Sequence, residues 1–572
     1  MDEGISNVEK HQRFRTNSAS QLSKTSGERK AEYVEDEDSK LRETPLDATH
    51  RTLSSRHIQL IGIGGSIGTA IFVQIGAALT HGGPGSLFVA FAFWSTVVLA
   101  LNNSLSEMVT WMPISSPFIR FAEHFVDPAL GFIAAVNFFV NMAINVPFEI
   151  TAFNLTLHFW TDRIPIVAVI FFVLLCYILL NIFAVKLYGE AEFWLALGKV
   201  LLALGLIFFT FIVMVGGNPL HDAFGFRNWN PSHVPGSPFA EYVKTGSTGR
   251  FMGFLTCLVQ AAFTIEGPEF ISMTAGEAAN PRLILPKTFR RTYARLLTFF
   301  VLGSLCVGIL VPYNDPNLLS ATANPQPGAG SSPYVIAMRN LRIGVLPHIV
   351  NALVMLSIFS AGNNFLYCAS RILYGMALEN QLGTRLSAKL RWCTRAGAPI
   401  WCVLASGIWG LLALLGVSNT SAVVLQWFAD LITVSYVFNY FCIALSYLRF
   451  FYALKAQNIS RDSLPHKGPW QPLCGYYALT LCSAMIIIQA YSVFMSDQWD
   501  IPTVIFVYAL ILALPLLFVL WKTTKRTKIH NLEEISFFAN ERERVDEYEK
   551  VVRYEKREGG LVRRIFDWFI GV

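Results

Sequence analysis

The chain has 572 residues, of which 53% are hydrophobic and only 15% are charged. A soluble domain carries about 25% charged residues, so this composition excludes an ordinary soluble protein and indicates one that needs lipid as a solvent. The net charge of +6 is modest, and Lys and Arg lie in short segments between apolar runs, which excludes a nucleic-acid-binding protein.

The first 52 residues are polar, carry both signs of charge and contain no apolar stretch. This composition predicts a disordered cytoplasmic tail at 1–52, in which the acidic run 35–38 is solvated. No cleavable signal peptide is expected, so the first hydrophobic helix would act as an uncleaved signal anchor.

Twelve apolar runs follow, each near the roughly 20 residues that span a bilayer. They are expected near 57–79, 85–110, 128–157, 165–187, 190–215, 251–275, 293–312, 345–375, 400–416, 421–448, 474–495 and 501–521. The sequence therefore predicts an all-α integral membrane domain of twelve transmembrane helices over 53–521. The charged tail 522–572 has an apolar end, typical either of an amphipathic helix on the membrane or of a helix packed on the protein's own loops.

The distribution of basic residues predicts the orientation of these helices. The segments 277–295 and 371–399 are rich in Lys and Arg, whereas 416–421 and 496–500 contain none. Because basic loops stay on the cytoplasmic side, both termini are expected in the cytoplasm.

The first run contains four glycines between Gly62 and Gly68. Glycine is a poor helix former, so a local unwinding is expected, and N–H groups freed within a membrane must line a cavity or bind a ligand. A solute carboxylate would suit them. Close helix packing through small residues is the alternative.

The sixth run carries a second break, at Gly267-Pro268, because proline lacks an N–H and clashes with the preceding helical turn. Two carboxylates, Glu266 and Glu269, flank it. Breaks five helices apart are typical of a transporter built from inverted repeats. We therefore predict a 5+5 inverted repeat with broken helices 1 and 6, plus two extra helices.

Ionisable residues within apolar runs need a partner or a function, because charge is costly in hydrocarbon. Besides Glu266 and Glu269, the candidates are Glu107, Glu149, Lys199, Asp430 and Arg371. Lys199 would pair, reach toward the interface or occupy the place of a cation; a purely structural tie to backbone carbonyls is equally compatible with the pattern.

The sequence contains no nucleophile–base pair, no phosphate-binding loop and no metal-ligand spacing, and its nine cysteines form no CxxC motif. No catalytic residue, metal or cofactor is therefore expected, and an enzyme is the least favoured class.

Several motifs together resemble the fungal amino-acid permeases of the amino acid–polyamine–organocation superfamily. They are the stretch 56–69, Glu107-Met108, the stretch 125–132, the stretch 190–194, Ala275-Gly276-Glu277 and Asn280-Pro281-Arg282. The resemblance covers roughly 50–525. It implies a LeuT-like fold and proton-coupled uptake at the plasma membrane.

The resemblance also implies roles for individual residues. The broken first helix would hold the solute carboxylate, and the sixth-helix pattern would lie near the solute. The implied solute-binding residues are Gly64, Gly65, Ser66, Ile67, Gly68, Thr69, Phe263, Glu266, Gly267 and Glu269. Lys199 matches a fifth-helix lysine whose ammonium replaces a sodium ion in related proton-coupled members, and Glu149 is a candidate for proton coupling.

Glu266 departs from the family, which has a small or apolar residue there. An extra carboxylate beside the break favours a cationic group on the solute, as in the branch linked to carnitine and polyamine uptake. The expected partners are an amino acid, carnitine or polyamine, protons and the lipid bilayer. A nutrient sensor that binds solute without transporting it is the alternative.

Overall fold

The fold is taken from a computed structural model of the chain. The structure describes residues 68–114, 117–161, 163–183, 185–273, 275–278, 280–323, 332–394, 398–418, 421–489, 491 and 501–537. The expected tail 1–52, the first-helix residues before Gly68 and the expected amphipathic end of the C-terminal tail lie outside these ranges.

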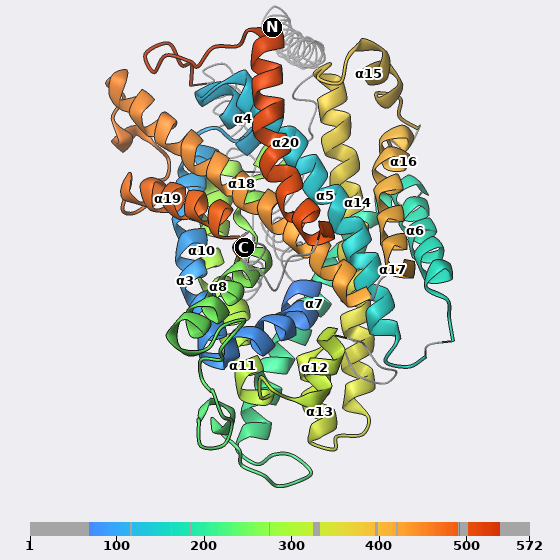
Figure 1. Ribbon diagram of the computed structural model, residues 1–572. Coiled ribbons are helices and arrows are strands. Elements are labelled where there is room, and N and C mark those ends of the chain that lie inside the picture. Colours follow the sequence, from blue (N-terminus) through green and yellow to red (C-terminus); the bar gives the residue numbers. More distant parts are fainter. Residues whose placement is uncertain are drawn as a thin grey trace, which may run out of the picture. The chain divides into compact units, whose positions relative to one another are not determined.

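The described residues form helices joined by loops (Figure 1). In chain order they are η1 Ala70–Gln74, α3 Ile75–Trp111, α4 Pro117–Phe125, α5 Pro128–Leu157, α6 Ile166–Phe183, α7 Val185–Met214, η2 Arg227–Trp229, α8 Gly246–Thr264, α9 Pro268–Met273, η3 Ala275–Glu277, α10 Pro281–Arg295, η4 Leu296–Val301, α11 Leu302–Leu310, α12 Pro316–Ala323, α13 Pro333–Asn340, α14 Leu346–Leu378, α15 Thr384–Leu390, α16 Ile400–Ile408, η5 Trp409–Leu414, α17 Leu415–Ser418, α18 Ser421–Ala456, η6 Arg461–Ser463, α19 Leu473–Ile488 and α20 Ile501–Lys525.

Within the described ranges, ten helical stretches are long and apolar enough to cross a membrane. Two features account for the difference from twelve. The first and second predicted runs join into one stretch, Ala70–Trp111, and the eleventh run forms the shorter apolar helix α19. The all-helical membrane architecture is therefore present, and α20 runs to Lys525, beyond the predicted end at 521.

A kink at Gly83 divides the long stretch Ala70–Trp111. Gly83 has φ 75° and ψ 171°, and Pro84 follows it inside α3. A Cβ on Gly83 would lie 2.8 Å from the Pro238 carbonyl oxygen, which accepts a hydrogen bond from the Gly85 N–H at 2.8 Å. The loop before α8 thus packs directly on the kink, and only glycine combines this backbone with this approach.

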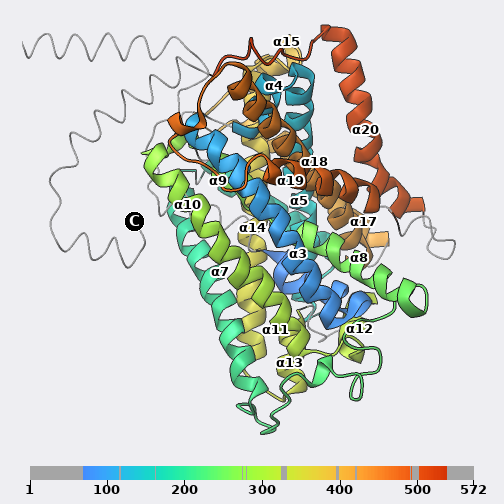
Figure 2. The same ribbon diagram turned by 90° about the vertical axis from the view of Figure 1, so that its left-hand side faces the viewer.

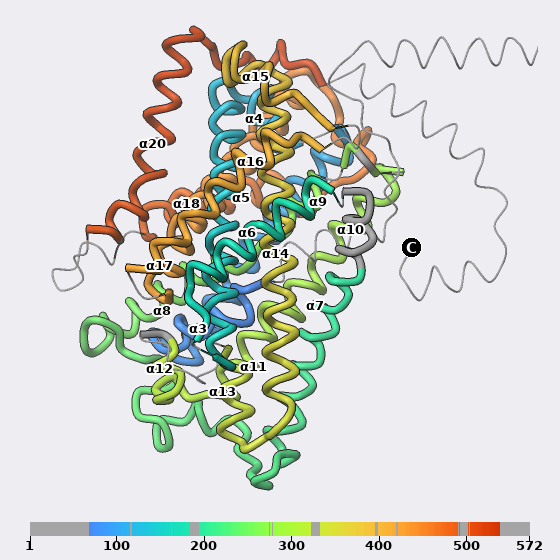
Figure 3. The backbone as a smooth tube through the Cα atoms, turned by 90° about the vertical axis from the view of Figure 1, so that its right-hand side faces the viewer, coloured from blue at the N-terminus to red at the C-terminus, as the bar shows by residue number. Residues whose placement is uncertain are grey.

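The central helices pack on one another through a continuous apolar core. Figure 1 shows α5 and α14 side by side, and α18 also packs on α5. Figure 2 shows α7 beside α11, while α3 packs along α8. In Figure 3, α20 lies at the edge of the bundle, where it contacts α18 and α5.

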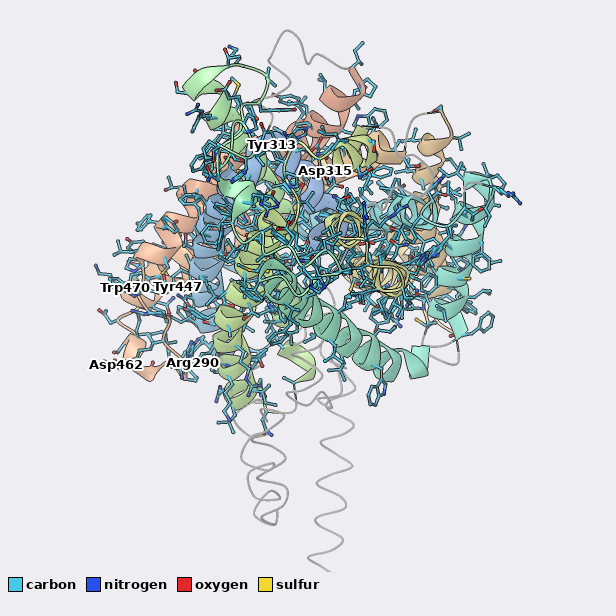
Figure 4. The ribbon with its side chains drawn as sticks, turned by 90° about the horizontal axis from the view of Figure 1, so that it is seen from below. Arg290, Tyr313, Asp315, Tyr447, Asp462 and Trp470 are labelled. Carbon is cyan, nitrogen blue, oxygen red and sulfur yellow. The ribbon has the colours of Figure 1, made fainter. Side chains whose placement is uncertain are left out.

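One membrane-buried carboxylate predicted from the sequence is a structural tie. Glu107, near the end of α3, is fully buried and accepts from Arg461 Nε at 3.0 Å and Nη2 at 2.9 Å. The Gly468 N–H donates to Oε2 at 2.9 Å, so the carboxylate is well satisfied. Tyr447 of α18 adjoins the pair, and Figure 4 labels Tyr447 and Asp462 on the same side of the molecule. This ion pair fastens the segment after α18 to α3.

A second tie joins the start of α5 to the end of α20. Asp127 caps α5 by accepting from the Ala129 N–H at 2.8 Å, directly before Pro128. Its carboxylate also accepts from Lys522 and, at 2.8 Å, from the Thr527 hydroxyl.

The basic segment 277–295 was expected to be a loop, and this expectation is wrong. Residues Pro281–Arg295 form α10, which continues through the π-helical turn η4 into α11. Asn280 precedes Pro281, a good first helical residue because its missing N–H has no partner to lose there. Arg295 is consequently carried into the interior, where its side chain is buried.

Candidate functional site

The predicted break in the sixth helix is confirmed. Helix α8 ends at Thr264 and α9 begins at Pro268, so Ile265, Glu266 and Gly267 are not helical. Gly267 has φ 149°, a backbone conformation that side-chain-bearing residues rarely adopt. The break thus exposes backbone groups inside the bundle that need partners.

Glu269 is fully buried and accepts a hydrogen bond from a backbone N–H group of the break. The Gly267 N–H lies 3.3 Å from both of its carboxylate oxygens. The Tyr440 hydroxyl lies 3.3 Å from Glu269 Oε1 and 3.3 Å from the Ile265 carbonyl oxygen, so its single proton serves either acceptor. The charge of Arg295 also acts on this carboxylate.

Arg295 lies directly against the break. A Cβ built on Gly267 would come within 1.8 Å of Arg295 Nη2. Glycine at this position therefore makes room for the guanidinium, and the guanidinium in turn places a positive charge beside Glu269. The sixth helix, α10 and α18 meet at this point.

Glu266 has a different environment. Its side chain is 7% exposed, and the Tyr436 hydroxyl of α18 adjoins it. Neither Glu266 Oε2 nor the Tyr436 hydroxyl makes a hydrogen bond of ordinary geometry to any residue in the described part of the chain. Its charged neighbours are two further carboxylates, Glu269 and Glu149.

Glu149 lies on α5, which is the third predicted span. It interacts with residues of the first span and of α7, which is the fifth. The Thr69 hydroxyl donates to Glu149 Oε2, and a Cβ on Gly68 would lie 3.6 Å from Oε1. Lys199 of α7 is 2% exposed, and its charge acts on the same carboxylate. The two residues predicted for coupling are thus brought together, next to the start of the described first helix.

Phe263 is the last predicted site residue. It is buried at the end of α8 and meets Phe148 of α5 edge-on, with ring centroids 5.3 Å apart. It therefore packs α8 on α5 one residue away from Glu149.

The predicted residues fall into two linked groups. Thr69, Glu149 and Lys199 form one, and Glu266, Gly267 and Glu269 form the other; the electrostatic contact between Glu149 and Glu266 connects them. Gly64, Gly65, Ser66 and Ile67 lie outside the described residues, so their predicted role stays a prediction.

Sequence reasoning missed Arg295, Tyr436 and Tyr440. Tyr436 and Tyr440 are four residues apart and so share one face of α18, a spacing that could have identified them. Arg295 directly precedes the apolar stretch that begins at Leu296, and a basic residue at such a position can be drawn into the interior. Neither signal names the partner helix.

Long apolar helices that enclose a broken helix and a cluster of charged side chains define a polytopic membrane protein of the transporter class. The amino acid permease family model matches residues 57–534. The chain therefore belongs to the amino acid permease family.

Individual relatives agree with this family. The general amino acid permease AGP2 of Saccharomyces cerevisiae is 45% identical, over 91% of this chain and 87% of the relative. The proline-specific permease of Emericella nidulans is 36% identical, over 91% and 93%. The basic amino-acid permease of S. cerevisiae is 37% identical, over 78% and 76%.

Among solved structures, the nucleobase-cation-symport-1 family transporter Mhp1, in a closed conformation with bromovinylhydantoin bound, has a TM-score of 0.45. It is 15% identical, and the match covers 88% of this chain and 99% of that one.

Proposed function

We propose that this chain is a proton symporter of the plasma membrane that imports amino acids or amino-acid-like cationic solutes. The observation that carries the proposal is the buried charge cluster between the first, third, fifth and sixth helices. Charges of this kind are costly within a membrane and are retained where a solute or an ion is bound. The relatives named as amino acid permeases support the solute class.

The proposed topology has twelve spans. The kink at Gly83 divides Ala70–Trp111 into the first and second spans, and α19 supplies the eleventh. Both termini would face the cytoplasm, as the basic segments predict. The 5+5 inverted repeat remains a proposal; the break between α8 and α9 supports its second half.

The proposed solute site lies between the two breaks. N–H groups of the first helix, from Gly64 to Thr69, would hold the solute carboxylate, since helix N-termini favour anions. Glu266, Gly267, Glu269 and Phe263 would contact the rest of the solute.

The proposed proton site is the Glu149 carboxylate. Thr69 ties it to the first helix and Lys199 brings a positive charge from α7, so a change in its protonation alters contacts between three helices. A coupling ion acts by binding one conformation better than another, and a shared buried carboxylate gives that difference.

Competitive uptake in a yeast strain without its own amino acid permeases tests the proposal. Labelled arginine, proline, spermidine and carnitine would be supplied with and without a protonophore. We expect uptake of at least one amino acid, and its loss when the proton gradient is collapsed. Surface-localised protein that binds solute without any uptake would contradict transport and support the nutrient sensor.

A further inference from the structure

The two carboxylates at the sixth-helix break are not equivalent. Glu269 already accepts from the Gly267 N–H, lies 3.3 Å from the Tyr440 hydroxyl and has the charge of Arg295 acting on it. Glu266 is nine-tenths buried, yet its Oε2 has no hydrogen-bond partner and no ion pair among the described residues. Burying a carboxylate without a hydrogen-bond donor or a cation costs free energy, so Glu266 is a candidate to bind a group of the solute that supplies one.

The charges around the break show what is lacking. Glu149 has Lys199, and Glu269 has Arg295. Glu266 is acted on by both of the other carboxylates, which adds to the negative potential at its position. Each of these two carboxylates thus has a cation that acts on it, whereas no cation among the described residues does so for Glu266.

We propose that the Glu266 carboxylate and the Tyr436 hydroxyl form a subsite for a second positive charge on the solute, carried by its side chain. A zwitterionic amino acid brings no side-chain charge to this position, whereas a cationic side chain would give Glu266 the counter-charge that it lacks among the described residues. The Tyr436 hydroxyl, which adjoins the carboxylate, completes the subsite, because it can hydrogen-bond to the carboxylate or to the solute. An ammonium or guanidinium group fits this chemistry.

In this arrangement Arg295 is a positioning residue. It occupies the space left by the missing side chain of Gly267 and balances Glu269. Glu269 therefore stabilises the backbone of the break, and Glu266 is the carboxylate that is available to the solute. The inference rests on the proposed function, since it concerns the same solute site.

Arginine and citrulline provide a matched pair of probes. They have the same α-amino and α-carboxyl groups and nearly the same side-chain shape, but only arginine carries a side-chain charge. Competition by each against a labelled solute gives a ratio of apparent KM values for the wild type and for Glu266→Gln. We expect the variant to lose at least about tenfold of the preference for arginine, the effect of removing one close charge pair.

Three further variants test the assignment. Glu266→Asp, which keeps the charge, should retain part of the preference, and Tyr436→Phe should lose a smaller part than Glu266→Gln. Arg295→Gln should lower surface abundance or Vmax for both solutes without changing their ratio, and Glu269→Gln added to it should restore part of the loss.

Equal changes for arginine and citrulline in Glu266→Gln would overturn the subsite. So would a variant whose preference is intact but whose uptake no longer depends on external pH, because Glu266 would then bind only a proton. If the wild type imports none of arginine, proline, spermidine and carnitine, the proposed function fails by itself. Binding of arginine and citrulline to the purified full chain, measured as a thermal shift, then still tests the subsite.

Discussion

The Arg295 guanidinium fills the space beside Gly267 that a side chain at Gly267 would occupy. A Cβ there would lie 1.8 Å from Nη2, far inside any contact that packed atoms show. The φ of 149° adds strain for any residue with a side chain. The break in the sixth helix and the buried arginine of α10 therefore depend on each other.

Gly267→Ala should consequently displace Arg295 and leave Glu269 without its counter-charge. We expect uptake of every solute to fall at least about tenfold, because the cost of an uncompensated buried charge reaches several kcal/mol. Radiolabelled uptake, normalised to the amount of protein at the cell surface, measures the effect.

Gly205→Ala is the matched control for this substitution. A Cβ on Gly205, in α7, meets no atom within 4 Å, and its backbone is helical. Normal uptake is expected. Full uptake in Gly267→Ala, or an equal loss in both variants, would contradict the dependence of the break on Arg295.

The ion pair between the buried Glu107 and the partly buried Arg461 should contribute to stability rather than to solute selection. It fastens the segment after α18 to α3, and the carboxylate is fully buried. Replacing Arg461 leaves the buried Glu107 carboxylate with the Gly468 N–H but without a counter-charge, which costs about 3 kcal/mol. Arg461→Gln should therefore lower the thermal unfolding temperature of the purified protein and leave the relative KM values of different solutes unchanged.

The ion pair between Asp222 and Arg227 serves as its comparison. It is also bidentate, with distances of 2.7 and 2.6 Å, but both side chains are solvent-exposed. Exposed pairs contribute little, so Arg227→Gln should leave the unfolding temperature nearly unchanged. An equal fall in both variants would show that burial is not what makes the Glu107 pair important.

The parts of the site that were predictable from sequence are those with a local signal. Gly267-Pro268 indicates a break because both residues disfavour a helix, and Glu149 and Lys199 stand out as charges in apolar runs. The signal for Arg295, its place directly before an apolar stretch, is weaker. This residue follows Arg290 and Arg291, and this basic composition is typical of a loop, whereas the structure continues the helix and buries its last residue.

Contacts between side chains that are distant along the chain could not be predicted from the sequence either. Tyr436 and Tyr440 lie more than 160 residues after the sixth-helix break, and only the packing of α18 on α8 places their hydroxyls there. The sequence alone does not distinguish the roles of Glu266 and Glu269. Their surroundings do, because Arg295 adjoins Glu269 and Tyr436 adjoins Glu266.

The tie between Asp127 and α20 should make stability depend on pH. Burial raises the pKa of Asp127, but the hydrogen bonds from Lys522, the Ala129 N–H and Thr527 outweigh it, so its pKa lies below the usual value. A lowered pKa in the folded state means that the stabilisation is complete above the unfolded-state value of about 3.9 and is lost as the pH falls below it.

Asp127→Asn should therefore lower stability at pH 7, by about 1 to 3 kcal/mol for a lost helix cap and a charge-assisted bond. The difference from the wild type should shrink below about pH 3.9, where the unfolded wild-type chain binds a proton at Asp127 that the native carboxylate does not. Unfolding temperatures of the purified protein between pH 3 and pH 7 measure this. A difference that is constant over that range would show that the charge of Asp127 is not what holds α20.

The hydrogen bond from Thr69 to Glu149 offers the most direct test of the proposed proton site. It crosses from the first helix to α5, and both side chains are buried. Thr69→Val keeps the shape of the side chain but removes the donor, so Glu149 retains only the charge of Lys199 as a compensating neighbour among the described residues. The carboxylate then loses the hydrogen bond that ties it to the first helix. We expect the coupling between the proton site and the first helix to be impaired, which lowers Vmax several-fold and changes the pH profile of uptake. Thr156→Val on α5 is the control: Thr156 is also fully buried, but its hydroxyl donates at 2.8 Å to the Ala152 carbonyl oxygen of its own helix. A loss of Vmax in Thr69→Val with no change in the pH profile would indicate that Thr69 only packs the first helix, and that the proton is coupled elsewhere.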